Sequence, residues 1–387
     1  MSNIIDYKIL VNATILGYKE KQNIVIDRDN IIKEITAKKI NLSPSDNVLD
    51  VEEDYVSLGG VDLQINGGLG LAFPDLEATD IHKLKKICDY LWQQGINAFL
   101  PTIVTTSIEK IRRSLSIVRS FMQQQSIHEL TAKVLGVHLE GPFLNPKKRG
   151  AHPEEYLLPL TIDNLKRVLG DDRDVVKMIT LAPELDPTGE AIEYLKKQNI
   201  IISLGHSLAT EAEANRAFKL GASTITHSFN AMPPLHHRKP GLLGAALVNS
   251  KVSCGLIADG KHVSPTMLKI VINSVTNWEQ IFLVSDALAP IGLPDGVYPW
   301  DSRQITVKNG TASLFDGTLS GTTLPLLTAV QNLVKWNICS AERAIAMATS
   351  YPRKAIAIPD LGIGQKANLL RWNYRSEKQQ ITWQRII

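Results

Sequence analysis

The sequence has few of the features that mark disulfide-rich or membrane-spanning proteins. Only three cysteines occur among its 387 residues, and Cys88, Cys254 and Cys339 share no short CxxC spacing, which excludes a disulfide framework and a cysteine-rich zinc module. No uninterrupted apolar run approaches the ~20 residues that a membrane-spanning helix needs. The N-terminal stretch has Asp6 and Lys8 inside its apolar residues and no small-residue cleavage site, so we expect no secretion signal and a cytoplasmic location.

An excess of charge of one sign is also absent. Lys and Arg total 42 and Asp and Glu total 39, which gives a formal net charge of +3. So slight an excess indicates neither nucleic acid nor a membrane as a partner, and it leaves small anions as candidate ligands. The hydrophobic content of 44% over this length supports one large core, and we expect one large α/β domain with a small companion.

What the sequence does contain is a regular alternation of apolar runs and segments with helical apolar spacing. This alternation is typical of repeated βα units and a parallel sheet. Eight strands are expected, at residues 56–65, 96–104, 132–140, 176–184, 200–207, 223–229, 252–260 and 280–288. Eight strands with intervening helices predict a (β/α)8 TIM-like barrel, in which functional residues gather at the C-terminal ends of the strands.

The two ends of the chain differ from the middle. Residues 1–55 and 350–387 alternate apolar and polar positions in short pieces, as antiparallel strands do, so we place both in one small β-sandwich domain beside a catalytic barrel of residues 56–349. Segments 76–95 and 209–221 are expected helices that stop at Gly95 and Gly221. Asn309 and Gly310 give a hairpin signal, which we interpret as an insertion in the barrel.

Polar residues stand where the expected barrel strands finish. Glu140, His206 and His227 would meet at one rim of the barrel, and a carboxylate with two neutral imidazoles suits zinc or a similar divalent ion with an open position. The alternatives are a solvated loop acid for Glu140 and satisfied core histidines for the other two. The full set of strand-end residues is Gln64, Glu140, Glu184, His206, His227, Asp259 and Asp286.

Asp286 ends the last expected strand. A carboxylate near a metal-bound water can take its proton and later return it to a leaving group. The alternative is a cap for the turn that follows.

Several longer motifs resemble, in order, those of the N-acetylglucosamine-6-phosphate deacetylases of the amidohydrolase superfamily. They are GVDLQINGG, GVHLEGPFLNPKKRGAH, LAPE, GHSLAT, THSFNAMPPLHHRKPG, ADGKHV, SDALAP and GTLSGTT. The resemblance spans nearly the whole chain. It implies a metal-dependent amide hydrolase of amino sugar metabolism that converts N-acetylglucosamine-6-phosphate to glucosamine-6-phosphate and acetate.

The resemblance also implies roles for individual residues. Glu140, His206 and His227 resemble the family's metal ligands, and Asp286 resembles its general base and acid. His152 resembles the residue that hydrogen-bonds the acetyl carbonyl of the substrate. Without the resemblance, His152 would be an ordinary loop residue.

A sugar phosphate also needs contacts of its own. Arg238 and His262 resemble the family's phosphate-contacting pair, and in the family the arginine comes from the neighbouring subunit, which implies a homodimer with shared active sites. By composition alone, Arg238 would be a solvated loop cation. The expected substrate-binding residues are Ala151, His152, Asn230, Ala231, Arg238, His262, Leu319, Ser320 and Gly321.

One position departs from the wider superfamily. Many amidohydrolases end their first strand in His-x-His to hold a second metal, whereas this chain has Gln64, Ile65 and Asn66 there. We therefore expect the second-metal position to be lost and one divalent ion per subunit to bind. The ligand types accept zinc, iron, cobalt or manganese, of which zinc is our prediction.

Two other functions are open at this point. Another amidohydrolase activity, such as cyclic-amide hydrolysis or deamination of an amino base, is the first, because fold alone does not fix function. A sugar-phosphate sensor without catalysis is the second, and it need not retain a stoichiometric metal ion. Lys147, Lys148 and Arg149 are expected on a solvated loop face, and His236 and His237 are loop residues without an assigned role.

Overall fold

A barrel of eight parallel strands forms the centre of the molecule, as the sequence predicts. The computed structural model describes residues 8–42, 47–126, 128–275 and 277–386. Each of the eight expected runs contains one barrel strand, and sequential strands pair in parallel. In order they are β6 (Gly60–Ile65), β9 (Ile96–Val104), β11 (Val137–Glu140), β12 (Val176–Leu181), β13 (Ile201–Leu204), β14 (Thr224–Ile225), β15 (Ser253–Leu256) and β16 (Ile281–Leu283).

The first and last strands close the barrel just beyond β16. The backbone N–H of Asp286 donates to the carbonyl of Gln64 at 2.9 Å, and that of Asn66 donates to the carbonyl of Ala287 at 2.7 Å. This seam brings the residues after β6 beside the residues after β16. The short strands β7 (Gly67–Gly68), β8 (Leu71–Ala72) and β10 (Lys133–Val134) flank the barrel.

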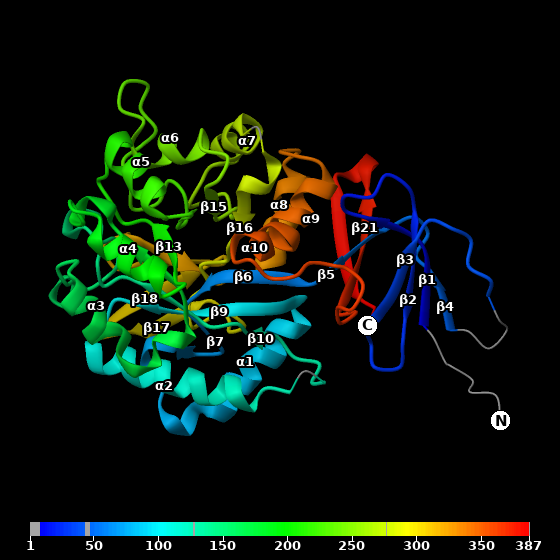
Figure 1. Ribbon diagram of the computed structural model, residues 1–387, viewed down its shortest axis with the longest axis horizontal. Helices are drawn as coiled ribbons and strands as arrows, with labels where there is room; N and C mark the ends of the chain where they lie inside the picture. The colour runs from blue at the N-terminus through cyan, green and yellow to red at the C-terminus, as the bar shows by residue number, and fades with distance from the viewer. Residues whose placement is uncertain (1–7, 43–46, 127, 276, 387) are drawn as a thin grey trace.

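Helices cover the outside of the barrel (Figure 1) and bury their apolar faces against it. The two expected helices are α1 and α5, and Gly95 and Gly221 follow them with positive φ angles of 81° and 137°. No described helix has the length and apolar character that crossing a bilayer requires. The helices are α1 (Ile81–Gln93), α2 (Ile108–Gln124), α3 (Ile162–Leu169), α4 (Glu190–Lys197), α5 (Glu211–Leu220), α6 (Gly241–Leu247), α7 (Pro265–Ser274), α8 (Leu326–Lys335), α9 (Ala341–Ala348) and α10 (Ser350–Ala355).

A four-stranded antiparallel sheet is inserted between β16 and α8. Asn309 and Gly310 form the predicted two-residue turn of its central hairpin, with φ angles of 50° and 77°. The sheet places Tyr298, Trp300 and Leu319 at the mouth of the barrel. Its strands are β17 (Gly296–Trp300), β18 (Arg303–Lys308), β19 (Thr311–Leu314) and β20 (Leu319–Thr322).

Strands from both chain ends meet in a small β domain beside the barrel, as expected (Figure 1, blue and red). The C-terminal β21 pairs with β5, and Trp372 of β21 is fully buried with its Nε1 donating to Ser57 Oγ at 2.9 Å. The chain then passes from β5 into β6 at Gly59, where an added Cβ would lie 2.2 Å from Asn97 Oδ1. The strands are β1 (Lys8–Ile15), β2 (Gln22–Ile26), β3 (Ile32–Thr36), β4 (Asn47–Asp50), β5 (Tyr55–Leu58), β21 (Leu369–Arg375) and β22 (Gln380–Arg385).

Candidate metal centre and active site

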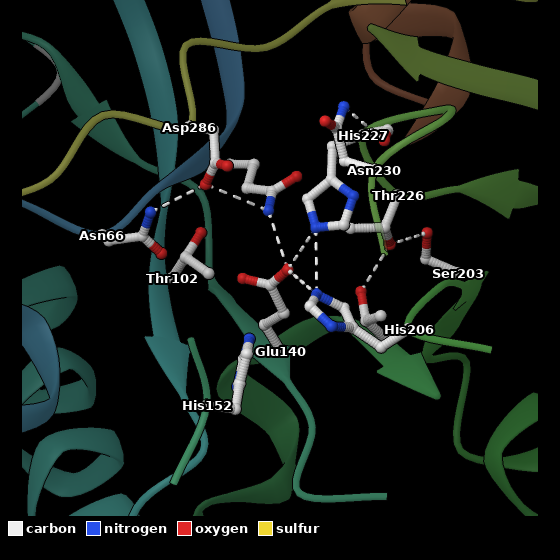
Figure 2. A network of polar contacts seen from close by, with 12 residues as sticks. Asn66, Thr102, Glu140, His152, Ser203, His206, Thr226, His227, Asn230 and Asp286 are labelled. Carbon is white, nitrogen blue, oxygen red and sulfur yellow. Dashed lines mark hydrogen bonds and ion pairs between the residues drawn. The ribbon is translucent and has the colours of Figure 1, made fainter. Parts of the chain in front are cut away.

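Three of the expected strand-end residues converge on one point at the C-terminal mouth of the barrel (Figure 2). Glu140 Oε1, at the end of β11, lies 2.9 Å from His227 Nε2 and 3.1 Å from His206 Nε2. The two ring nitrogens are 3.0 Å apart. All three side chains are buried. The structure thus brings together the residues that the sequence predicts as metal ligands.

Backbone geometry turns these side chains toward one another. His206, His227 and Asp286 all have positive φ angles, of 48°, 25° and 47°, which non-glycine residues rarely adopt. Such conformations cluster at functional sites, where surrounding structure holds them in place. They occur here because the chain turns within two or three residues of the ends of β13, β14 and β16 and so points these side chains into the mouth of the barrel.

The hydrogen-bond pattern of the three residues fits a cation. His206 Nδ1 donates to the carbonyl oxygen of Lys148 at 2.9 Å, so in the neutral imidazole Nε2 has no hydrogen and presents a lone pair. That lone pair faces the Oε1 of Glu140, which is also an acceptor. Two acceptors at this distance repel unless a positive charge lies between them, and a carboxylate with two imidazoles is a common ligand set for divalent ions.

Glu140 keeps its negative charge in this setting. Burial opposes its ionisation, but a hydrogen on the facing ring nitrogens of His206 and His227, where present, hydrogen-bonds the carboxylate and, with the charge of His227, holds the pKa of Glu140 well below its ordinary value. Gln64 Nε2 also donates to Glu140 Oε1 at 3.0 Å. The carboxylate is therefore ionised at neutral pH, as a metal ligand must be.

Asp286 lies in the same network and has a different environment. Its Oδ1 accepts hydrogen bonds from Asn66 Nδ2 at 2.9 Å and from Gln64 Nε2 at 3.2 Å. Burial, and then the negative charge of Glu140, raise the pKa of Asp286 to about 7. A carboxyl group with such a pKa can both accept and donate a proton near neutral pH.

His152 lines the cavity beside His206, with the two ring centres 4.5 Å apart. The backbone N–H of Thr105 donates to His152 Nδ1 at 3.3 Å, and the Thr105 hydroxyl lies 2.9 Å from the same nitrogen. Burial lowers the pKa of His152 to about 3, so the ring is neutral and its hydrogen lies on Nε2. His152 therefore offers a donor to the site.

Glu140, His152 and His206 also have donor atoms within 4.8 Å of one another, so His152 could replace His227 in a ligand set. We favour His227, because its Nε2 is within 3.0 Å of the facing atoms of both Glu140 and His206. The Nε2 of His152 holds a hydrogen in the tautomer described above and has no free lone pair for a metal.

A cavity of about 690 Å³ opens over these side chains. Asp259, three residues after β15, accepts from His262 Nδ1 at 2.7 Å, which leaves His262 Nε2 for a ligand. Gly321 does not line the cavity; an added Cβ there would meet the carbonyl oxygen of Asp286 at 2.6 Å, so its place is a close packing contact. The expected substrate-binding residues that do line it are Ala151, His152, Asn230, Ala231, His262, Leu319 and Ser320.

Arg238, which the resemblance assigns to the neighbouring subunit's site, lies away from the cavity of its own chain. It is exposed on the loop that precedes α6, and it is not among the residues that line the cavity of its own chain. His236 and His237 share this exposed loop, with ring centres 4.4 Å apart.

Several groups at the site were not predicted from the sequence. The carbonyl of Lys148 orients His206, although the sequence suggests only a solvated basic face there. Arg303 of the inserted sheet donates to the carbonyl of Ala151 at 2.7 Å and so ties the sheet to the loop that bears His152. The position of a backbone carbonyl cannot be predicted from residue type. Thr105 could have been predicted, because it directly follows the expected strand 96–104.

Comparison with known proteins agrees with this geometry. Residues 55–384 match the amidohydrolase family. The chain belongs to this family. It is a hydrolase with a barrel fold, as the family is. Amidohydrolases generally use a divalent metal ion, and the cluster of Glu and His side chains described above is a donor set that suits such an ion.

Several individual proteins are similar to this chain over most of their length. N-acetylglucosamine-6-phosphate deacetylase of Bacillus subtilis (strain 168) is 34% identical over 342 residues, 87% of this chain and 83% of that protein. N-acetylgalactosamine-6-phosphate deacetylase of Escherichia coli O157:H7 is 33% identical over 325 residues, 83% of this chain and 84% of that protein. A deacetylase from Mycobacterium smegmatis, solved in complex with N-acetyl-D-glucosamine-6-phosphate, superposes with a TM-score of 0.85 at 26% identity, covering 98% of each chain.

Proposed function

We propose that this amidohydrolase removes the N-acetyl group from N-acetylglucosamine-6-phosphate and releases glucosamine-6-phosphate and acetate. The observation that supports it most is the placement of Asp286, with a pKa of about 7, in the same cavity as the Glu140, His206 and His227 cluster. A base and a metal site in one cavity are what amide hydrolysis by an activated water requires. The named activities of its relatives supply the substrate.

Glu140, His206 and His227 would hold one divalent ion per subunit, with zinc as our proposal. When bound, the ion supplies Lewis acidity toward the acetyl carbonyl and lowers the pKa of a water molecule. Gln64 and Asn66 stand in the sequence where many amidohydrolases have His-x-His, and here they donate hydrogen bonds to the carboxylates of Glu140 and Asp286. This use of their amides supports a site with a single ion.

The proton transfers fall to Asp286. Its Oδ1 is held by Asn66 and Gln64, so Oδ2 is the oxygen that takes the proton from the attacking water and passes it to the departing amine. The Nε2–H of His152 donates to the acetyl oxygen as negative charge develops there. The neutral tautomer set by Thr105 suits this role, because it provides a hydrogen at the atom that faces the cavity.

The phosphate would be held by His262 with Asn230 and Ala231, and by Arg238 from a second copy of the chain. Asp259 fixes the orientation of His262. The exposed position of Arg238, outside the cavity of its own chain, supports its delivery to a neighbouring site and hence a homodimer. A guanidinium is well suited to a phosphate because it can form two parallel hydrogen bonds.

We further propose a cytoplasmic location, with no nucleic acid or membrane partner. All three cysteines are free thiols, and burial raises the pKa of Cys88 and Cys254 to about 12. Inert thiols without disulfides suit a reducing compartment.

Acetate release tests the proposal. The purified protein should release stoichiometric acetate from N-acetylglucosamine-6-phosphate, lose this activity with a chelator and regain it with Zn²⁺. Two matched substrates are compared with it. N-acetylgalactosamine-6-phosphate tests whether the enzyme distinguishes the sugar epimer, and unphosphorylated N-acetylglucosamine tests whether it requires the phosphate. Binding of the sugar phosphate without acetate release would instead favour a sensor, and turnover of a cyclic amide in its place would favour another amidohydrolase activity.

A further inference from the structure

Four buried polar side chains cross the barrel interior one layer below the candidate metal centre. His138 lies on β11, Thr180 on β12 and Ser203 on β13, and Thr226 directly follows β14. Their exposed fractions are 1%, 0%, 1% and 3%. None of them touches the cavity, and none has a role in the reaction proposed above. Buried polar groups without a catalytic part call for another explanation.

The four side chains form an unbroken line of short hydrogen bonds. His138 Nδ1 lies 3.0 Å from the carbonyl oxygen of Leu63, and His138 Nε2 lies 2.7 Å from Thr180 Oγ1. Thr180 Oγ1 is 2.6 Å from Thr226 Oγ1. Thr226 Oγ1 is in turn 2.6 Å from Ser203 Oγ, a link that Figure 2 shows beside His206.

Chemistry fixes the direction of every bond in this line. The carbonyl of Leu63 can only accept, so His138 Nδ1 donates and Nε2 accepts in the neutral ring. Thr180 must then donate to His138, and with its single hydrogen used it accepts from Thr226. Thr226 accepts from Ser203 for the same reason. The line has only one arrangement in which all four members are paired, so the spacing of the strands that bear them is tightly specified.

The same strands bear the three candidate metal ligands. Glu140 lies two residues after His138 on the same side of β11, and His227 directly follows Thr226. His206 lies three residues after Ser203, across Gly205. An added Cβ at Gly205 would lie 2.9 Å from the Cβ of Thr226, which shows how closely the strands approach at this level.

We propose that His138, Thr180, Thr226 and Ser203 are positioning residues that fix the ends of β11, β13 and β14 relative to one another and so raise the affinity of the site for its divalent ion. This inference rests on the metal centre proposed above. Substitution of the partners of metal ligands commonly weakens metal binding by about 10- to 100-fold. Because these side chains act through the strands, we expect the lower end of that range.

The test measures Zn²⁺ affinity rather than turnover. Thr180→Val and Thr226→Val keep the shape of the side chain and remove the hydroxyl, whereas Thr180→Ser and Thr226→Ser keep the hydroxyl. Thr224→Val is the matched control, because Thr224 is equally buried on β14 but its hydroxyl contacts only the carbonyl of Ile202, at 3.4 Å. Dissociation constants come from competition with a chromophoric chelator, and the absorption spectrum of the Co²⁺-loaded protein reports ligand geometry.

We expect the two Val variants to bind Zn²⁺ about tenfold more weakly and to change the Co²⁺ spectrum. The Ser variants and Thr224→Val should keep wild-type affinity and spectrum. Unchanged affinity in the Val variants, even with a lower melting temperature, refutes the positioning role, as does equal weakening in Thr224→Val. Should both Val variants fail to fold, Ser203→Ala removes only the last donor, and an unchanged dissociation constant in that variant refutes it. A wild-type protein that binds no Zn²⁺ would instead refute the metal centre itself.

Discussion

Replacing Asp286 with Asn should nearly abolish turnover and leave metal content unchanged. The rise of its pKa from 3.8 to about 7 corresponds to about 4 kcal/mol in favour of the protonated carboxyl, because burial and the charge of Glu140 oppose ionisation. Asn is isosteric and neutral, and it can neither take the proton of the attacking water nor return it to the amine. A single general acid or base typically contributes 10²–10⁴-fold, so a residue with both roles should lower kcat by about 10³- to 10⁴-fold.

The pH dependence follows from the same carboxyl. Asp286 must be ionised to accept the first proton, so kcat/KM should rise with pH through its pKa. A bound cation favours the ionised form, and the acid limb of the loaded enzyme therefore lies below pH 7. Asn66→Ala removes a hydrogen bond that lowers the pKa of Asp286, so it should move this limb to higher pH while retaining activity at alkaline pH.

The assay is acetate release as a function of pH, with metal content measured on the same samples. If Asp286→Asn has full metal content and keeps more than about a tenth of wild-type kcat, Asp286 is not the general base, because loss of a general base lowers the rate by more than that. An acid limb that does not move in Asn66→Ala would assign the limb to another group.

Two further predictions concern stability and assembly. Burial raises the pKa of Asp62 from 3.8 to about 6, so its contribution to the free energy of unfolding is present below pH 3.8 and is lost as the pH rises through 6. Between pH 4 and pH 7, the free energy of unfolding of Asp62→Asn in urea should therefore rise by about 2 kcal/mol relative to that of wild type. A difference between the two proteins that does not change with pH would contradict this. Arg238→Ala and Asp286→Asn subunits, unfolded together and refolded as mixed dimers, should recover about a quarter of wild-type activity at low substrate if Arg238 acts on its neighbour. No recovery would place Arg238 in its own site or outside catalysis.

The sequence predicts the barrel and the meeting of the three proposed metal ligands for one physical reason. Parallel strands present their C-terminal ends at one rim, so Glu140 and the two histidines converge once the eight apolar runs are recognised. The groups that orient these ligands are harder to predict, since the carbonyl of Lys148 is a property of the loop conformation and not of the lysine side chain. The role of Arg238 follows neither from the residue types nor from the structure of one chain, because its proposed target is in another copy of the chain.

The proposed metal ligands and the proposed acid–base residue come from different parts of the barrel, and the order of the strands explains why. The proposed ligands end or closely follow β11, β13 and β14, which are near neighbours in the order of the strands. Asp286 follows the last strand, and its partners Gln64 and Asn66 lie at the end of the first strand and just after it; these two strands meet at the closing seam. The buried setting that raises the pKa of Asp286 therefore exists only in the closed barrel. We expect opening of the seam to lower the pKa of this carboxyl toward its ordinary value while leaving β11, β13 and β14 in place, so that the proposed proton transfer would be lost before the proposed metal binding.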